Sequence, residues 1–386
     1  MKAELVFNVS QGKVIMTIFE SKPDIYHAAV TAIIEVLGIR ENESILIITN
    51  PDSDVSEISQ ALYQAAGAHG GKPVLIYQPK KSQLDMCEDA VIGALEKEPT
   101  VVVSMSAGKL GKDRVRIKDP IEHEGRTFDH IFNFLLETKR IRAFWSPGVT
   151  TEIWARTVPL DYVRVREEAA SLKEILDKAE KVHISAPGGT DLTIGLKGRV
   201  TKVDDGDFQE GGSGGNLPCG EAFISPELGS SNGRIVFDGS ISLHDGDIVI
   251  KEPIVCQVAD GFVTTVEGGS DADRLSDTLM RSKQNAEKFF EEGKINEATK
   301  VDYVKNARNL GELGIGLNPM ATVSGNMLED EKAYHTCHIA IGSNYDNDAQ
   351  ALTHLDGLIR DPTITAYYSD GSEDVIMKDG DLLLEI

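Results

Sequence analysis

The apolar positions in the first half of the chain follow two different periods. Residues 24–38 and 54–68 carry apolar side chains at the three- and four-residue spacing of an amphipathic helix. Between and after them lie short apolar runs at 44–49, 73–77 and 100–104, which are typical of strands buried on both faces. This alternation of helices and buried strands predicts a parallel sheet covered by helices.

The pattern changes from Val182 onward, where short strand-like runs are separated by turns rich in glycine and aspartate. The pairs Asp238-Gly239, Asp245-Gly246 and Asp260-Gly261 lie between apolar runs, and Asp-Gly at such positions predicts hairpins. One helix is predicted at about 271–292. The second half is therefore expected to be rich in antiparallel strands.

A charged helix at about 164–181 is predicted to connect the two halves. We expect an α/β N-terminal domain with a parallel sheet at residues 1–180. An α+β C-terminal domain rich in antiparallel strands is expected at residues 181–386 and should contain the site. No GxGxxG follows the first strand, so a dinucleotide site has little support.

The charge of the chain excludes some classes of partner. The formal net charge is −23 over 386 residues, which argues against binding to nucleic acid or to anionic membranes. The four cysteines are widely scattered and indicate neither a disulfide framework nor a zinc ribbon. We find no signal pattern at the N-terminus and no apolar run long enough to span a membrane, so the expected location is cytoplasmic.

Two histidines and an aspartate near the C-terminus are candidate metal ligands. His354-Leu355-Asp356 is flanked by apolar residues and is predicted to be a strand, in which His354 and Asp356 point to one face. His338 begins another apolar run, also predicted to be a strand. Imidazole and carboxylate groups that converge suit a divalent metal. His335 is better interpreted as a structural residue or as support for a ligand.

Two glutamates have an unusual context for charged residues. Glu221 and Glu312 each lie in a glycine-rich, apolar stretch, where a carboxylate is costly to bury unless it is paired or binds a metal. For either residue alone, a buried salt bridge or an exposed turn would be a sufficient explanation. Together with the two histidines and the aspartate, they favour a shared metal site. The charged run at 329–332 is most simply a solvated helix face, although Glu331 could also orient a ligand histidine.

Several motifs resemble the M29 family of metallo-aminopeptidases, in the same order along the chain. They are Gly189-Thr190-Asp191-Leu192, Asn216-Leu217-Pro218-Cys219-Gly220-Glu221, Gly311-Glu312-Leu313-Gly314, Asp330-Glu331-Lys332-Ala333, His338-Ile339-Ala340-Ile341-Gly342-Ser343-Asn344-Tyr345 and His354-Leu355-Asp356. The resemblance covers the second half well and the first half weakly.

This resemblance implies a homodimer and a two-metal aminopeptidase that removes the N-terminal residue of a peptide substrate. The family's metal ligands match Glu221, Glu312, His338, His354 and Asp356. The resemblance implies two divalent ions, with zinc, cobalt and manganese all compatible, bridging an activated water.

Two of the matching residues are expected to take part in catalysis. Glu312 would bind metal and also handle the proton of the activated water. Tyr345 matches a family tyrosine and would steady the tetrahedral intermediate.

Two other functions are open at this point. A ring-cleaving dioxygenase of the same fold, acting on dihydroxypyridine, uses a single iron held by two histidines and one aspartate. His338, His354 and Asp356 would satisfy that set of ligands. The third alternative is a non-catalytic binding protein that has kept the fold with its site unused.

Overall fold

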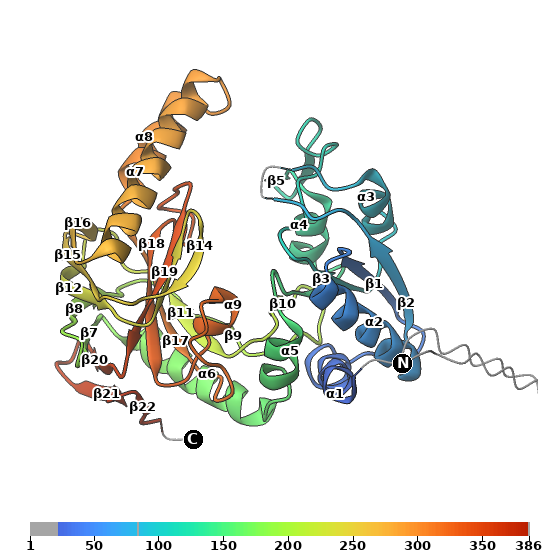
Figure 1. Cartoon of the computed structure of the whole chain (residues 1–386), viewed down its shortest axis with the longest axis horizontal. Coiled ribbons are helices and arrows are strands. Elements are labelled where there is room, and N and C mark those ends of the chain that lie inside the picture. Colours follow the sequence, from blue (N-terminus) through green and yellow to red (C-terminus); the bar gives the residue numbers. More distant parts are fainter. Residues whose placement is uncertain (1–21, 83–84, 385–386) are drawn as a thin grey trace, which may run out of the picture.

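The computed structural model of this protein describes residues 22–82 and 85–384, which form two lobes (Figure 1). The N-terminal segment, in which we found no signal pattern, lies outside these residues. Among the described residues, no helix combines the length and the apolar character needed to cross a membrane.

The N-terminal lobe is built on a five-stranded sheet in which all neighbouring strands are parallel. Its strands, in order across the sheet, are β10 (Gly214–Asn216), β6 (Arg142–Trp145), β3 (Val101–Met105), β1 (Ser44–Thr49) and β2 (Lys72–Tyr77). The parallel sheet predicted from the apolar runs is confirmed.

Helices cover both faces of this sheet, because its apolar side chains alternate between two cores. One core packs Ile45 and Val103 against α1 (Pro23–Thr31), α2 (Ser53–Ala68) and α5 (Thr151–Thr157). The π-helical segment Ala32–Val36 extends α1 on that face. The other core packs Leu46 and Val102 against α3 (Asp89–Leu95) and α4 (Ile131–Glu137). A small hairpin of β4 (Ile121–His123) and β5 (Arg126–Phe128) precedes α4.

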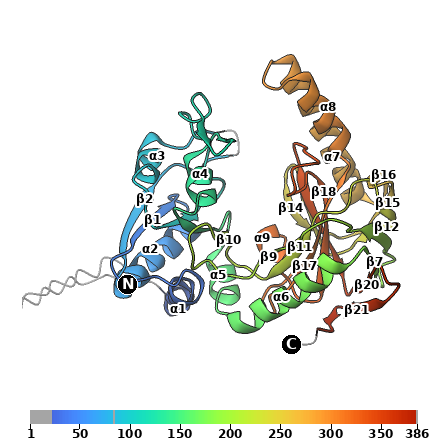
Figure 2. The same cartoon turned by 180° about the vertical axis from the view of Figure 1, so that it is seen from behind.

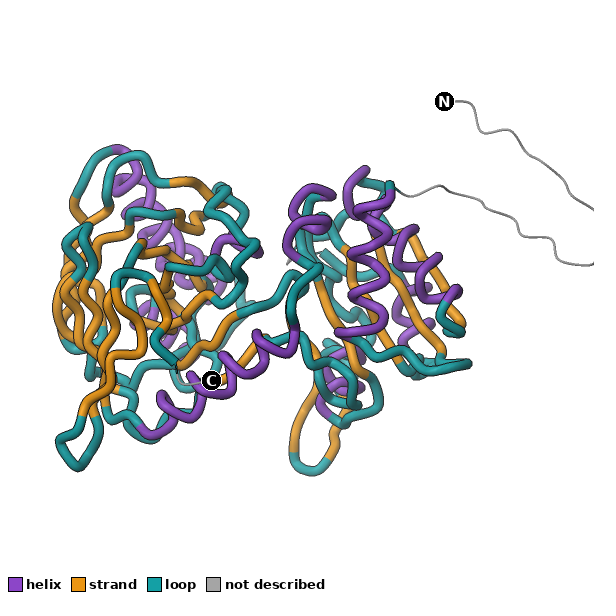
Figure 3. The backbone as a smooth tube through the Cα atoms, turned by 90° about the horizontal axis from the view of Figure 1, so that it is seen from below, coloured by secondary structure: helices purple, strands orange, loops and turns teal. Residues whose placement is uncertain are grey.

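The C-terminal lobe is rich in strands (Figure 3), which form two antiparallel sheets. Side chains of both sheets share one hydrophobic core. The seven-stranded sheet has the order β14 (Gly246–Val249), β13 (Ser240–Leu243), β19 (His354–Arg360), β18 (Thr336–Gly342), β17 (Leu310–Gly316), β11 (Glu221–Ile224) and β9 (Lys202–Asp204). The eight-stranded sheet has the order β16 (Phe262–Glu267), β15 (Ile254–Ala259), β12 (Asn232–Phe237), β8 (Asp191–Gly195), β7 (Lys181–Ser185), β20 (Thr363–Tyr367), β21 (Glu373–Lys378) and β22 (Asp381–Leu382). The predicted antiparallel character of this half is confirmed.

Two of the three Asp-Gly hairpins form as predicted. Asp245-Gly246 joins β13 to β14, and Asp260-Gly261 joins β15 to β16. The hairpin predicted at Asp238-Gly239 is wrong, because there the chain crosses from the eight-stranded sheet to the seven-stranded one. The Asp238 carboxylate accepts a hydrogen bond from the backbone amide of Arg360 on β19, so this turn joins the two sheets.

Four helices belong to the connector and to the C-terminal lobe. They are α6 (Tyr162–Lys178), α7 (Ser270–Glu291), α8 (Glu297–Asn306) and α9 (Met327–Asp330). Helix α6 runs along one side of the molecule from the N-terminal lobe to the C-terminal lobe, as seen from the front and from behind (Figures 1 and 2). Helices α7 and α8 form a hairpin that projects beyond the sheets.

The chain returns to the N-terminal lobe after it has entered the C-terminal one. Strand β10 pairs in parallel with β6, and the segment that follows leads directly into Glu221 at the start of β11. The site is therefore tied covalently to the edge of the parallel sheet. The division into domains at residue 180 stays a prediction.

Candidate metal centre

The five predicted ligands lie on one face of four adjacent strands of the seven-stranded sheet. Glu221 begins β11, Glu312 lies on β17, His338 on β18, and His354 and Asp356 on β19. The registers bring them together, because directly opposed residues of antiparallel strands share a face. These pairs are Glu221↔Gly316, Gly314↔His338, Glu312↔Ala340 and Ala340↔Asp356.

The alternation along each strand explains why this face is polar. Ile315, Ile339 and Leu355 point into the core between the two sheets, so their neighbours in the sequence point away from it. A glycine makes room for one of the rings. A Cβ atom on Gly314 would lie 2.1 Å from both Cε1 and Nε2 of His338.

One group of candidate ligands consists of Glu312, His354 and Asp356. His354 Nε2 lies 3.2 Å from Asp356 Oδ1 and 3.5 Å from Glu312 Oε2. Ligand atoms bonded to one ion at about 2.1 Å lie roughly 3.0–3.4 Å apart, so these separations suit a shared ion. A hydrogen bond 2.8 Å long between His354 Nδ1 and the Ser343 carbonyl leaves Nε2 free to bind metal.

A second group consists of Glu221, Glu312 and His338. His338 Nε2 lies 3.0 Å from Glu312 Oε1 and 3.6 Å from Glu221 Oε2. Glu312 therefore belongs to both groups, with one carboxylate oxygen directed to each. The set proposed for a single iron, His338 with His354 and Asp356, does not converge as one group, because Glu312 lies between the two histidines.

Unpartnered buried atoms show that these residues fit a metal ion. Glu221 Oε2, Glu312 Oε2, His338 Nδ1 and Asp356 Oδ1 are all buried without a hydrogen-bond partner among the described residues. Such atoms are rare in folded proteins because losing water without a replacement is costly. Three of the four are carboxylate oxygens, which a divalent cation would satisfy directly.

Lys332 is the residue of this centre that sequence reasoning missed. Its ammonium group is fully buried and lies 2.5 Å from Glu221 Oε1, 2.6 Å from Glu331 Oε1 and 3.6 Å from Asp204 Oδ2. The run at 329–332 was expected to be a solvated helix face, and that expectation is wrong, since Glu329, Asp330 and Lys332 are all buried.

The shifted pKa values follow from burial and from these close contacts. Burial raises the pKa of Glu221 to about 8, against the opposing effect of Lys332. Burial lowers the pKa of His338, but Glu312 and Glu221 outweigh it and bring it to about 9. Burial raises the pKa of Asp356, but His354 outweighs it and brings it to about 2. Without a cation, protonated imidazoles thus compensate the carboxylates, and a metal would replace those protons.

The remaining candidates lie at different distances from the centre. The Tyr345 ring packs edge-on against His354, with ring centroids 5.0 Å apart, so it lies beside the first group. His335 is directed elsewhere, toward the Gly380 carbonyl and Asp381. Its interpretation as a structural residue is consistent with these contacts. Glu331 contacts Lys332 rather than a ligand histidine.

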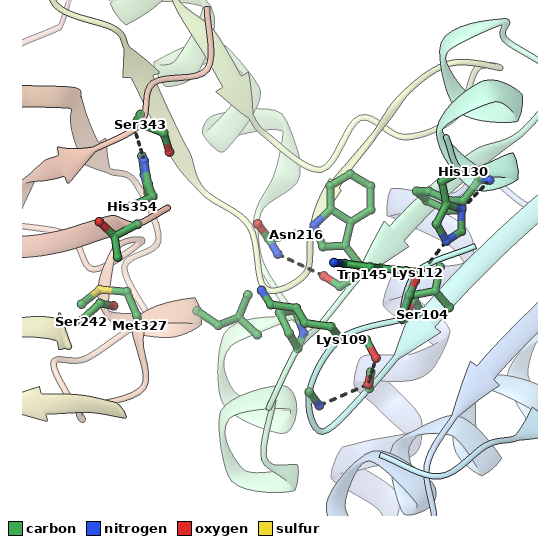
Figure 4. A pocket seen from close by; sticks show the side chains of 18 of the residues that line it. Ser104, Lys109, Lys112, His130, Trp145, Asn216, Ser242, Met327, Ser343 and His354 are labelled. Atoms are coloured by element: carbon green, nitrogen blue, oxygen red, sulfur yellow. Dashed lines mark hydrogen bonds between the residues drawn. The ribbon is translucent and has the colours of Figure 1, made fainter. Parts of the chain in front are cut away.

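A cavity of about 1110 Å³ lies between the lobes, and the first group opens into it (Figure 4). His354 and Asp356 line it together with Tyr345, whereas Glu221, Glu312 and His338 do not. Its opposite wall comes from the N-terminal lobe and includes Ser104, Ser106, Lys109, Lys112, His130 and Trp145. The first group therefore faces the cavity through two of its three residues, whereas no residue of the second group lines the cavity.

Two comparisons of the sequence match proteins that are described as dioxygenases. The family model for NicX, 2,5-dihydroxypyridine 5,6-dioxygenase, matches residues 149–339, just under half of the chain. A curated 2,5-dihydroxypyridine 5,6-dioxygenase of Pseudomonas putida is 28% identical over 134 residues, which make up 33% of this chain and 36% of that protein. The match thus spans about a third of the length of that relative.

Two solved structures share the fold. The 2,5-dihydroxypyridine dioxygenase of Pseudomonas putida KT2440 has a TM-score of 0.67 at 20% identity, covering 93% of this chain and 96% of its own. Wild-type AmpT from Thermus thermophilus has a TM-score of 0.63 at 17% identity, covering 94% and 99%. At these identities the likeness concerns the fold alone.

The expectation of a metallo-aminopeptidase, a hydrolase acting on peptides, is wrong. The family model and the curated relative both match a dioxygenase. The physical reason for the error is that imidazole and carboxylate ligands on one sheet suit hydrolytic and oxidative metals alike. The resemblance to the M29 family therefore holds for the fold that AmpT shares, and not for the reaction.

Proposed function

We propose that this protein is a metal-dependent dioxygenase that opens the ring of a hydroxylated aromatic heterocycle. In such a reaction both atoms of dioxygen enter the product, one carbon–carbon bond of the ring breaks, and the ring itself supplies the electrons. The observation that carries the proposal is the group of Glu312, His354 and Asp356, of which His354 and Asp356 line the cavity between the lobes. The match to the dioxygenase family model supports it.

Glu312, His354 and Asp356 would hold a single ferrous ion. When bound, iron of this kind supplies the redox chemistry that lets dioxygen react with a hydroxylated ring. Because His354 and Asp356 line the cavity, a ligand in the cavity could approach an ion held by these residues. The second group is less suited to another ion, because Lys332 already compensates the charge of Glu221 at 2.5 Å.

The surrounding residues orient the ligands and the ring. His338 donates a hydrogen bond to Glu312 and fixes the carboxylate that both groups share. Tyr345 packs against His354 and lines the cavity, where its hydroxyl could hydrogen-bond a ring oxygen. Trp145 lines the opposite wall and offers an aromatic surface to a flat ligand.

The test compares two histidines, one in the proposed metal centre and one outside it. Purified protein would be loaded anaerobically with Fe²⁺ and given 2,5-dihydroxypyridine, with oxygen uptake and loss of the ring's ultraviolet absorbance as readouts. His354→Asn should lower the iron content of the protein and reduce the rate of oxygen uptake by at least about a hundredfold. His335→Asn should leave both unchanged, because His335 lies outside the centre and asparagine tolerates its φ of 64°.

Two outcomes would count against the proposal. One is oxygen uptake that persists in the His354 variant. The other is the absence of uptake by fully iron-loaded protein across a panel of hydroxylated pyridines and benzenes.

The expectation of a homodimer, which came from the resemblance, continues as a proposal. Two chains of 42.0 kDa would give a particle of about 84 kDa in light scattering. A particle with the mass of one chain at micromolar concentration would contradict it.

A further inference from the structure

The loop that follows β3, residues 106–112, lies where parallel sheets commonly bind ligands. Strand β2 lies on one side of β1 and β3 on the other, so the chain leaves β1 and β3 in opposite directions. Ligands of open α/β sheets bind in the crevice at the carboxyl ends of such strands. Here that crevice opens into the same cavity as the metal centre.

Buried amide side chains hold this loop in place. Asn50 Oδ1 accepts hydrogen bonds from the Ser106 hydroxyl at 2.9 Å and from the Ala107 amide at 2.7 Å. Gln78 Nε2 donates to the Leu110 carbonyl at 2.9 Å. Asn50 and Gln78 are both buried, so the loop backbone is fixed before any ligand arrives.

Two lysines of this loop extend into the cavity without a counter-charge. Figure 4 shows the side chains of Lys109 and Lys112 reaching from the N-terminal wall toward the side that carries His354. Neither lysine forms an ion pair within residues 22–82 and 85–384. Their neighbour Lys81, by contrast, pairs with Glu88 at 2.5 Å.

The carboxylates that line the cavity are mostly engaged elsewhere. Asp113 accepts hydrogen bonds from three backbone amides. Asp247 accepts from a serine hydroxyl and a backbone amide, and Glu331 is paired with Lys332. Asp129 is exposed and pairs with neither lysine of the loop. The two ammonium groups are thus available to an anionic ligand.

We propose that Lys109 and Lys112 bind a carboxylate of the substrate, which would make the substrate a hydroxylated aromatic carboxylic acid. This inference rests on the proposed ring-opening function and narrows its substrate class. The ring would lie along Trp145, with its hydroxyl groups toward His354 and Asp356. A protein with a net charge of −23 repels anions at long range, so a local pair of cations is what an acidic substrate needs.

The test measures binding separately from turnover. The chain has two tryptophans, of which Trp154 is fully buried and Trp145 lines the cavity, so fluorescence quenching reports ligands there. Iron-loaded protein would be titrated without oxygen with 6-hydroxypyridine-3-carboxylate and with 2,5-dihydroxypyridine, which has no carboxylate. We expect the carboxylate probe to bind at least about tenfold more tightly, and less so in high salt.

Matched lysine variants assign the preference to the loop. Lys109→Ala and Lys112→Ala should each weaken binding of the carboxylate probe on the order of tenfold and leave the other probe within about twofold. Lys118→Ala removes an exposed lysine outside the cavity lining and should change the affinity for neither probe. Circular dichroism checks that the variants fold, which we expect because all three lysine side chains are exposed.

The outcomes separate this inference from the proposed function. A carboxylate preference that is absent, or that survives the double variant, overturns the lysine site even if rings are opened. A lysine-dependent preference without oxygen uptake supports the binding site and refutes the ring-opening reaction.

Discussion

At the scale of single residues, the metal centre depends on a position that has no side chain. Gly314 lies beneath the His338 imidazole, and an added Cβ would lie 2.1 Å from two of its ring atoms. Gly314→Ala should therefore displace His338 and with it the Glu312 carboxylate. We expect metal affinity to fall at least about tenfold, and overpacking to lower the free energy of unfolding by about 1–3 kcal/mol.

A second glycine provides the control for that substitution. Gly93 lies in α3, and a Cβ there would meet no heavy atom within 4 Å. Gly93→Ala should leave metal content unchanged and add up to about 1 kcal/mol of stability, since alanine favours the helix. Metal analysis and urea unfolding measure both variants. Normal metal content in Gly314→Ala would mean that His338 does not position the ligands.

Single residues also show how far the sequence alone could lead. His354 and Asp356 were recognisable because a two-residue spacing in a strand puts both on one face. The burial of Lys332 was not recognisable, because it depends on Glu221 and Asp204, which are more than a hundred positions away in the chain. A charged run gives no local sign that distant carboxylates will surround it.

At the scale of elements, Arg142 on β6 ties the helical segment made of α1 and its π-helical extension, residues 23–36, to the parallel sheet. Its guanidinium donates to the Leu37 and Gly38 carbonyls, beyond the end of that segment, and to both carboxylate oxygens of Glu43. Both side chains are largely buried, at 3% and 12% exposure. Removing one partner of such a pair leaves a buried charge without compensation, which is strongly destabilising.

Glu43→Gln should therefore lower the free energy of unfolding by about 2 kcal/mol at pH 7, somewhat less than for a fully buried pair. Burial raises the pKa of Glu43, but hydrogen bonds from Arg142 and the Arg40 amide outweigh it and hold the pKa below its ordinary value of 4.5. A lowered pKa contributes stability above the unfolded value, and this contribution is lost as the pH falls through the folded value. The difference between wild type and variant should thus shrink below about pH 4.5.

An exposed pair serves as the control for this prediction. Glu174 pairs with Lys178 on α6, with both side chains largely solvent-exposed. Glu174→Gln should leave stability essentially unchanged at every pH. Denaturant unfolding between pH 3 and pH 7 would measure the free energy of unfolding of both variants. If the Glu43 variant were less stable than the wild type by the same amount at every pH, the charge-based explanation would be contradicted.

Some strands can be predicted from the local pattern of apolar residues, and others cannot. Strands β1, β3, β18 and β19 follow from apolar runs, because burial on one or both faces leaves a period in the sequence. Strand β10 consists of Gly214, Gly215 and Asn216, which have no strand propensity. It forms because the edge of β6 lies beside it, and that neighbour comes from far along the chain.

At the scale of the whole molecule, the buried carboxylates of the C-terminal lobe should make its stability depend on the metal. In the group proposed to hold the ion, Glu312 Oε2 and Asp356 Oδ1 are buried and have no hydrogen-bond partner in the described part of the chain. A ligand that binds only the folded state adds about 2.7 kcal/mol at a hundredfold excess over its dissociation constant. Removing the metal with a chelator should then lower the thermal midpoint of the wild type on the order of 5–10 °C.

A variant identifies which part of the molecule is responsible for that shift. Asp356→Asn keeps the shape of the side chain but removes one charged metal ligand, so the variant should bind the ion more weakly. Differential scanning calorimetry should then show little change in its thermal midpoint when Fe²⁺ or a chelator is added. Glu373→Asn would alter an exposed acid on β21, which belongs to the eight-stranded sheet and not to the sheet of the ligands, and should retain the full shift. An undiminished shift in the Asp356 variant would place the stabilising ion elsewhere. Loss of the shift in that variant alone would tie the stability of the lobe to the same residues that face the substrate cavity.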